Sequence, residues 1–242
     1  MTTPPGRPAP ATPEEVAQHR RAQRRGRALV GLAALALAGF AALLVLVLLR
    51  DTAAFDLAAT RDLQRLDSPA VFAVLLAVSW LGFQPQASVI GALLVAFLLW
   101  RRLRLEAGFM VLALALGALN QALKLVARRA RPSAALDHIH VYDHATGASF
   151  PSGHVLTYVL ACGFLAYLAH TLVQRRARVR RALLALLLAL IVLVGPSRVY
   201  LGQHWTTDVI ASYLLGTALL IAVLAGYRRA KAHQLARATR RR

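Results

Sequence analysis

Three short polar stretches carry the residue types that could do chemistry, and the last of them is the richest. Between Ser197 and Asp208 the chain holds an arginine, a histidine and an aspartate. If the chain is helical from Trp205 onward, His204 and Asp208 lie four residues apart on one helix face. A carboxylate placed there can hold one ring nitrogen as N–H and leave the other free to attack. Arg198 adds a planar fork of donors that suits a tetrahedral oxyanion such as phosphate.

The second stretch is Pro151–Ser152–Gly153–His154, which directly precedes an apolar run. Ser152 and Gly153 could open a helix with free N–H groups, which form a ready cradle for an anion. His154 would then lie in the first turn, where it could give a proton to a leaving group. The plainer interpretation is an ordinary N-cap turn beside an interfacial histidine.

The third stretch contributes Lys124 and Arg131, which are seven residues apart and would share one helix face about two turns from each other. Pro132 marks the expected end of that helix. The plainer interpretation is a basic helix end that snorkels to the membrane surface. Together the three stretches supply three cations, a helix N-terminus and two histidines. That set can bind a phosphate, attack it and protonate its leaving group without a metal.

A further polar patch could hold a divalent metal, because histidine and aspartate are common ligands. It consists of Asp137, His138, His140, Asp143 and His144. A solvated loop is the favoured interpretation, so we expect neither a metal nor a cofactor.

The composition indicates that these stretches sit in a membrane protein. Of 242 residues, 58% are hydrophobic, and the mean hydropathy is +0.54. We expect an all-α integral membrane protein with six spans, plus a short interfacial helix at about 70–83 that is too short to cross. The expected spans are the apolar runs 28–49, 86–100, 106–127, 153–173, 182–196 and 207–227. We also expect residues 1–27 to be a disordered basic tail and 228–242 a second basic tail.

In this chain of net charge +19, the distribution of the basic residues decides the expected orientation. With six spans, 21 of the 29 lysines and arginines fall on one side, which the positive-inside rule makes cytoplasmic. Both termini are then cytoplasmic, and the three polar stretches all lie at the extracytoplasmic face of the cell membrane. The basic residues punctuate apolar runs instead of forming one face, so a nucleic-acid partner is not expected.

The three stretches together resemble the tripartite signature of the type-2 phosphatidic acid phosphatase superfamily. The matched positions are Lys124, Arg131 and Pro132, then Pro151, Ser152, Gly153 and His154, then Ser197, Arg198, His204 and Asp208. The resemblance covers about residues 70–227 and implies a six-helix membrane fold, here expected over 28–227.

The resemblance also implies a role for each matched residue. His204 would be the nucleophile that forms a phosphohistidine, Asp208 would orient it, and His154 would protonate the leaving oxygen. The groups that would bind the phosphoryl oxygens are Lys124, Arg131, Arg198 and the Ser152–Gly153 backbone.

The expected function is therefore hydrolysis of a lipid phosphate or diphosphate. Candidate substrates are undecaprenyl diphosphate, phosphatidic acid and phosphatidylglycerol phosphate. One alternative is a membrane phosphotransferase that uses the same site with an acceptor alcohol in place of water. A vanadate-dependent haloperoxidase would use a similar pocket, but six spans argue against it. Another alternative is a channel, transporter or lipid-binding protein, but its polar groups would line a path through the bilayer instead of gathering at one face.

Overall fold

The computed structural model describes residues 13–142 and 145–240, and all regular structure in these residues is helical. Within these described residues, five helical segments are long and apolar enough to cross a membrane. They are Arg20–Leu48, Arg104–Ala127, Gly153–Leu172, Ala177–Tyr200 and Thr206–Arg240. The expectation of an all-helical chain with several spanning helices is confirmed.

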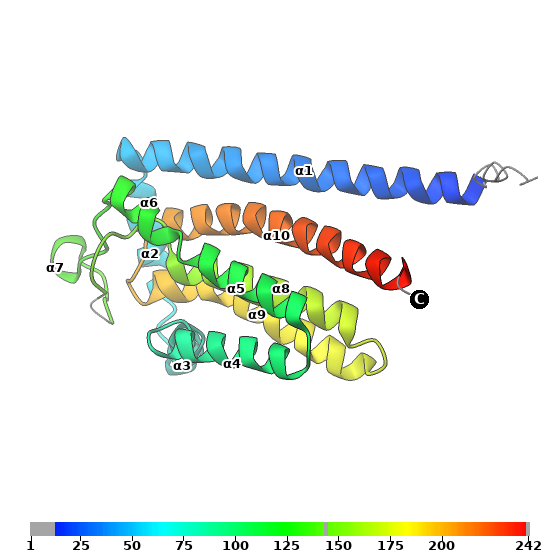
Figure 1. The fold of residues 1–242 in the computed structure, drawn as a ribbon. Helices are drawn as coiled ribbons and strands as arrows, with labels where there is room; N and C mark the ends of the chain where they lie inside the picture. Colours follow the sequence, from blue (N-terminus) through cyan, green and yellow to red (C-terminus); the bar gives the residue numbers. More distant parts are fainter. Residues whose placement is uncertain (1–12, 143–144, 241–242) are drawn as a thin grey trace, which may run out of the picture.

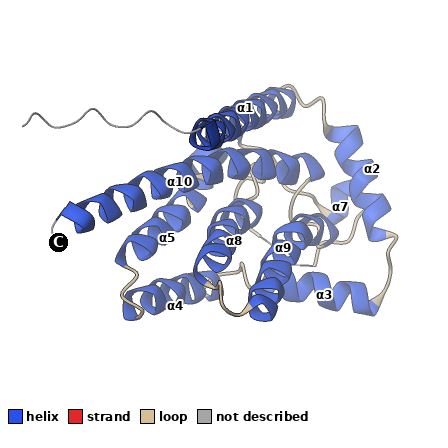
Figure 2. Cartoon of the chain, turned by 90° about the vertical axis from the view of Figure 1, so that its right-hand side faces the viewer, coloured by secondary structure: helices blue, strands red, loops and turns tan. Residues whose placement is uncertain are grey.

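Helix α8 (Gly153–Leu172) lies at the centre of the bundle and packs against α5 (Arg104–Gly117), α9 (Ala177–Tyr200) and α10 (Thr206–Arg240) (Figure 2). Its side chains Leu160 and Phe164 are fully buried. Because α8 is surrounded on several sides, the residues at its first turn are held in fixed positions relative to the ends of α9 and α10.

Helix α1 (Pro13–Leu48) packs mainly against α10 and turns large apolar side chains such as Val30 and Leu35 outward (Figure 1). The expectation that residues 1–27 form a disordered tail is wrong for residues 13–27, which continue this helix. Pro13 suits a first helical position, and the segment that follows it consists mostly of arginine, glutamate, glutamine and alanine, which are good helix formers. The apolar part of α1 is already helical, so extending this helix needs no new nucleation step and each added residue costs little free energy. Residues 1–12 lie outside the described residues.

The predicted short helix is present as α3 (Pro69–Trp80), which begins after Ser68 with Pro69 in its first turn. Helix α4 (Gln86–Trp100) follows and runs alongside the longer helices (Figure 1). With 15 residues, α4 is only about 22 Å long at 1.5 Å per residue. It is therefore shorter than a bilayer core of about 30 Å, and five helices, not six, meet the length required of a span.

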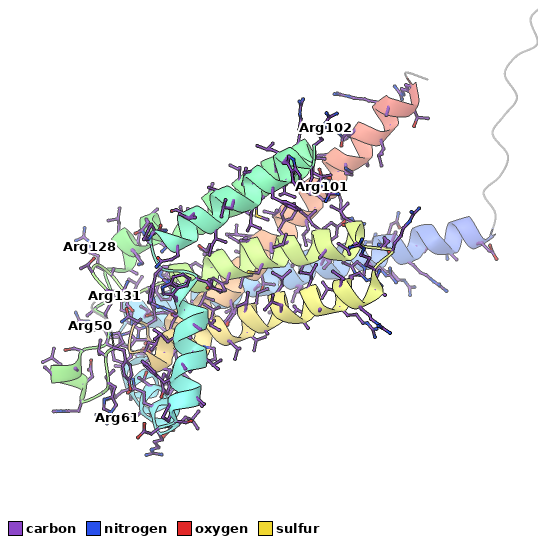
Figure 3. All side chains as sticks on the ribbon, turned by 90° about the horizontal axis from the view of Figure 1, so that it is seen from below. Arg50, Arg61, Arg101, Arg102, Arg128 and Arg131 are labelled. Atoms are coloured by element: carbon purple, nitrogen blue, oxygen red, sulfur yellow. The ribbon has the colours of Figure 1, made fainter. Side chains whose placement is uncertain are left out.

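Several short helices and the loops next to them gather at one end of the bundle, and the N-terminal end of α1 and the C-terminal end of α10 lie at the other (Figure 1). The gathered helices are α2 (Ala53–Gln64), α6 (Asn120–Ala127) and α7 (Ala134–Asp137). Helix α2 lies within a segment in which the sequence indicated no helix. Arg101 and Arg102 lie at the end of the bundle that carries the C-terminal end of α10, whereas Arg128 and Arg131 lie at the opposite end, which we call the loop end (Figure 3).

Candidate active site

A cavity of about 800 Å³ at the loop end brings the three polar stretches together. Its polar lining includes Lys124, Arg131, His154, Arg198 and His204. These side chains come from α6, α8, α9 and two loops, so residues up to 80 positions apart share one space. Two histidines and three cations facing one cavity form a site that suits an anion with several oxygens.

Two of these residues reach the cavity from elements that differ from those expected. Helix α6 ends at Ala127, and Arg128 follows in the left-handed region with φ of 45°. Arg131 is therefore in the loop and does not share a helix face with Lys124 as expected. The expected span 182–196 also ends too early, because α9 continues to Tyr200 and carries Arg198 in its last turn. Arg131 is fixed instead by its guanidinium, which donates to the carbonyl of Gln203 at 2.6 Å.

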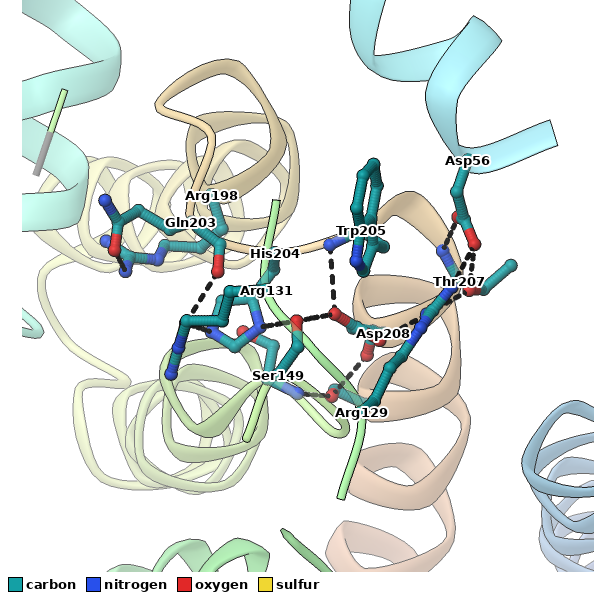
Figure 4. A network of polar contacts seen from close by, with 12 residues as sticks. Asp56, Arg129, Arg131, Ser149, Arg198, Gln203, His204, Trp205, Thr207 and Asp208 are labelled. Atoms are coloured by element: carbon teal, nitrogen blue, oxygen red, sulfur yellow. Dashed lines mark hydrogen bonds and ion pairs between the residues drawn. The ribbon is translucent and has the colours of Figure 1, made fainter. Parts of the chain in front are cut away.

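His204 lies in the loop just before α10 and is 2% exposed (Figure 4). Its Nδ1 is 3.5 Å from Oδ2 of Asp208 and 3.5 Å from Oγ of Ser149. Its Nε2 is 3.4 Å from the guanidinium of Arg131. When Nδ1 carries its proton toward Asp208, the lone pair on Nε2 points toward the guanidinium of Arg131, which lines the cavity. This is the geometry expected of a nucleophilic imidazole with a carboxylate partner.

Burial controls the charge of His204. It lowers the pKa of the imidazole from 6.5 to about 4, and the nearby guanidinium groups of Arg198 and Arg131 act in the same direction. The hydrogen bond and charge of Asp208 oppose them by raising the pKa. At neutral pH the ring is therefore neutral, and its free nitrogen keeps the lone pair that an attack requires.

The Ser152–Gly153 stretch begins α8 at the cavity but offers different groups from those expected. The N–H of Ser152 is not free, because it donates to Oγ of Ser212 at 2.7 Å. The hydroxyl of Ser152 is buried without a partner. Gly153 lines the cavity, and a Cβ there would lie 2.3 Å from the side-chain nitrogen of Asn120. The small residue thus lets α6 approach α8 closely.

His154 faces the cavity from the first turn of α8, and its buried Nε2 has no hydrogen-bond partner among the residues that the structure describes. A buried polar atom with no partner is costly, so a ligand in the cavity would satisfy it. The ring packs edge-on against Phe83, with centroids 5.3 Å apart. A Cβ on Gly82 would lie 2.4 Å from Cδ2 of the ring. The turn after α3 therefore forms a close wall that fixes where the imidazole can be.

The same wall holds Arg198. Its guanidinium donates to Oγ of Ser79 at 2.6 Å and to Oε1 of Gln203 at 3.3 Å. The guanidinium carbon also lies over the ring of Phe83, 5.2 Å from the centroid. Arg198 is 2% exposed, so its charge lies in a largely dry environment next to the cavity. Buried charge of this kind acts more strongly on an anion than surface charge does.

Asp208 has partners that the sequence did not identify. Ser149 donates a short hydrogen bond from its hydroxyl to Oδ2, and the N–H of Trp205 donates to the same oxygen at 2.9 Å. Arg129 donates to Oδ1 at 2.6 Å (Figure 4). Arg128, Arg129 and Arg131 lie close together in the sequence, and this cluster could have pointed to Arg129. Only Arg131, however, fits the motif. Nothing in the sequence indicated Ser149.

The His/Asp-rich patch is engaged in loop contacts where the structure describes it. Oδ2 of Asp137 accepts from the N–H of Ser133 at 2.7 Å. The N–H and carbonyl of His140 both bond to the side chain of Gln64. Asp143 and His144 lie outside the described residues. In residues 13–142 and 145–240, no group of three or more histidines, cysteines or acids is placed to hold a metal ion.

Comparison with known proteins gives matches to one family. The family model described as PAP2 superfamily matches residues 106–232. Over 105 residues the chain is 33% identical to phosphatidylglycerophosphatase B of Bacillus subtilis (strain 168), which covers 43% of this chain. The alignment spans 49% of that protein, so the chain matches about half the length of this relative.

Two solved structures share the fold. The crystal structure of the first transmembrane PAP2 type phosphatidylglycerolphosphate phosphatase from Bacillus subtilis gives a TM-score of 0.71 at 24% identity, over 81% of this chain and 96% of that one. Aquifex aeolicus LpxE gives a TM-score of 0.58 at 22% identity, over 71% of this chain and 95% of that one. At these identities the likeness concerns the fold.

Proposed function

The chain belongs to the PAP2 superfamily, and from this membership and the geometry of the cavity we propose that it is a membrane phosphatase that hydrolyses a lipid phosphate or diphosphate. The family match confirms the resemblance indicated by the three motifs. The relative at 33% identity is named for its action on phosphatidylglycerophosphate, which makes that lipid one candidate substrate alongside phosphatidic acid and undecaprenyl diphosphate.

One observation carries the proposal. Two histidines and three cations face a single cavity whose remaining wall is largely apolar. The apolar lining includes Ile90, Leu94, Leu114, Leu165 and Leu187. A phosphate at the polar end would leave the rest of its molecule against hydrocarbon, which suits a lipid and not a soluble phosphate ester.

The proposed reaction uses the two histidines in turn. Nε2 of His204 attacks phosphorus, and a P–N bond forms as the bond from phosphorus to the leaving oxygen breaks. The leaving oxygen takes the electron pair of that bond and a proton from His154. Water then attacks the phosphohistidine, giving up a proton to His154, and the P–N bond breaks to return His204.

The cations act on the phosphoryl oxygens in this scheme. Lys124, Arg131 and Arg198 surround the polar end of the cavity and offset the charge that grows on those oxygens during transfer. The unpartnered hydroxyl of Ser152 supplies a further donor. No metal or cofactor enters the proposal, because the positive charge and the acid come from side chains.

The membrane orientation is part of the same proposal. The chain is a multi-pass membrane protein, and we assign α4 as a sixth crossing despite its 15 residues, within a domain of residues 28–227. Even numbers of crossings leave both termini on one side, which the basic flanking segments make cytoplasmic. The site then faces the extracytoplasmic side of the cell membrane, beside the lipid head groups.

Phosphate release from a panel of lipid mono- and diphosphates tests the proposal. Purified protein in detergent is assayed with and without EDTA, and with and without an added acceptor alcohol. We expect release of inorganic phosphate from at least one lipid, unchanged by EDTA. Phosphoryl transfer to the alcohol in place of release would identify a phosphotransferase. No turnover of any lipid phosphate would refute an enzyme of either kind.

Gly82 provides a test of the wall around His154. The change Gly82→Ala puts a Cβ 2.4 Å from Cδ2 of His154, which is closer than two such atoms can approach, so the imidazole must move. We expect a loss of roughly 10- to 100-fold in kcat, since small misplacements of a reacting group are costly. Gly108→Ala is the matched control, because a Cβ there meets no atom within 4 Å. Equal activity of both variants would show that this wall does not position His154.

A further inference from the structure

A buried charge cluster beside the cavity contains an arginine and an aspartate that none of the three motifs includes. Asp56 of α2 is completely buried, and its Oδ2 accepts from the guanidinium of Arg129 at 2.5 Å. The other terminal nitrogen of that guanidinium lies 2.6 Å from Oδ1 of Asp208. One arginine thus joins a carboxylate from α2 to the carboxylate that contacts His204 (Figure 4).

Asp56 is itself held on the first turn of α10. Its Oδ1 accepts from the N–H of Thr207 at 2.8 Å, and its Oδ2 accepts from the hydroxyl of Thr207 at 2.8 Å. The hydroxyl of Thr52 accepts from Arg129 at 2.8 Å. A carboxylate at a helix N-terminus is favourable, so α2 is attached to the start of α10 by charge as well as by hydrogen bonds.

This arrangement divides the two oxygens of Asp208 between two tasks. Arg129 occupies Oδ1, whereas Oδ2 remains for His204, Ser149 and the N–H of Trp205. Arg129 does not line the cavity, in contrast to Arg131 two residues later. Its guanidinium contacts Asp208 from outside the cavity lining, so it can act on a phosphate in the cavity through Asp208.

We propose that Arg129, held by Asp56, is a positioning residue that fixes the carboxylate of Asp208 and thereby the ring of His204. The inference rests on the proposed phosphatase function. Without the guanidinium, the buried carboxylates of Asp56 and Asp208 would have no cation between them. Two like charges buried close together repel each other, so the carboxylates would not keep their present arrangement. Lysine would not replace Arg129, because a single ammonium group lacks the fork that reaches both carboxylates.

Five variants separate positioning from phosphate binding and from folding. Arg129→Met removes the fork, and Asp56→Asn removes one of the two carboxylate charges. The double variant carries both changes. Arg131→Met removes a cation that faces the cavity, and Arg128→Met changes the exposed neighbour as a control. Each is assayed for kcat and KM on the lipid phosphate that the wild type hydrolyses, for calorimetric binding of inorganic phosphate, and for its thermal unfolding midpoint.

We expect Arg129→Met to lose roughly 10- to 100-fold in kcat, the usual effect of removing a group that orients a reacting one. Its KM should stay within about threefold, and inorganic phosphate should bind at full stoichiometry. Arg131→Met should instead raise KM and weaken phosphate binding, and Arg128→Met should behave as wild type. The double variant should be more active and more stable than the product of the single effects predicts, because it leaves only one buried carboxylate.

Three results would overturn the inference. One is an Arg129→Met variant whose kcat matches the wild type. Another is a loss of phosphate stoichiometry in that variant equal to its loss of turnover, which would show a purely structural role. The third is a double variant whose losses simply multiply. A wild-type protein that hydrolyses no lipid phosphate would overturn the proposed function and this inference with it, so the two failures are distinguishable.

Discussion

Replacing His204 by alanine should lower phosphate release by at least about 10⁴-fold, because the proposed phosphoryl-enzyme bond forms on this side chain. The ring is buried beside Asp208, its neutral form holds a free lone pair at neutral pH, and that lone pair is directed to the cations of the cavity. Initial rates on the preferred lipid phosphate measure the loss. Acid-labile labelling of the protein by ³²P-substrate should disappear in the same variant.

The control for this change is a histidine on the helix that follows His204 but far from the cavity. His233 lies exposed toward the C-terminal end of α10, and His233→Ala should keep full activity. Inorganic phosphate should still bind to His204→Ala, since Lys124, Arg131 and Arg198 remain. A His204→Ala protein that folds, binds phosphate and turns over lipid at even a tenth of the wild-type rate would rule out the phosphohistidine.

Replacing His154 by alanine should slow hydrolysis of a lipid phosphate by about 10²- to 10⁴-fold, the range for removing a general acid. The effect should depend on the leaving group. An alkoxide needs a proton to depart, whereas p-nitrophenolate is stable without one. With p-nitrophenyl phosphate, the first step should therefore be nearly normal in the variant.

The second step gives this prediction its sharpest signature. By microscopic reversibility the group that protonates the leaving oxygen also accepts the proton of the attacking water. His154→Ala should therefore release a burst of p-nitrophenol and then stall as phosphohistidine, which stopped-flow absorbance and acid-labile label both detect. His170→Ala, exposed near the other end of α8, is the matched control. A uniform loss on both substrates, with no burst, would assign His154 a role other than proton transfer.

The two histidines show most clearly what could be predicted from the sequence and what depended on the fold. Local sequence was enough to select His154 and His204, because each lies in a short polar stretch beside an apolar run long enough to be recognised. The four-residue spacing between His204 and Asp208 also suggested their contact, but the structure places His204 in the loop before α10 and not on one helix face with Asp208 as expected. The short helix at 69–80 was predictable from Ser68–Pro69 for the same local reason.

Other features depended on contacts between distant parts of the chain. The Ser152 N–H was expected to be free, but Ser212 sixty residues later accepts it. Arg131 was expected on a helix that ends earlier, and it reaches the cavity through a bond to the carbonyl of Gln203. A pattern in the sequence does not show which donor is already used, because that depends on the packing of another element.

By itself, the sequence determined the helical class, most of the apolar spans and the residues of the three motifs, because periodicity, length and spacing are local properties. Only the tertiary structure decided that Asp56 and Arg129 join the site, that Ser149 bonds to Asp208, and that Gly82 makes room for His154. Each of these is a contact across 59 to 79 residues or between separate helices. Such contacts are fixed by how α2, the α3 turn and the 128–152 loop pack over the start of α8 and α10, which no local spacing encodes.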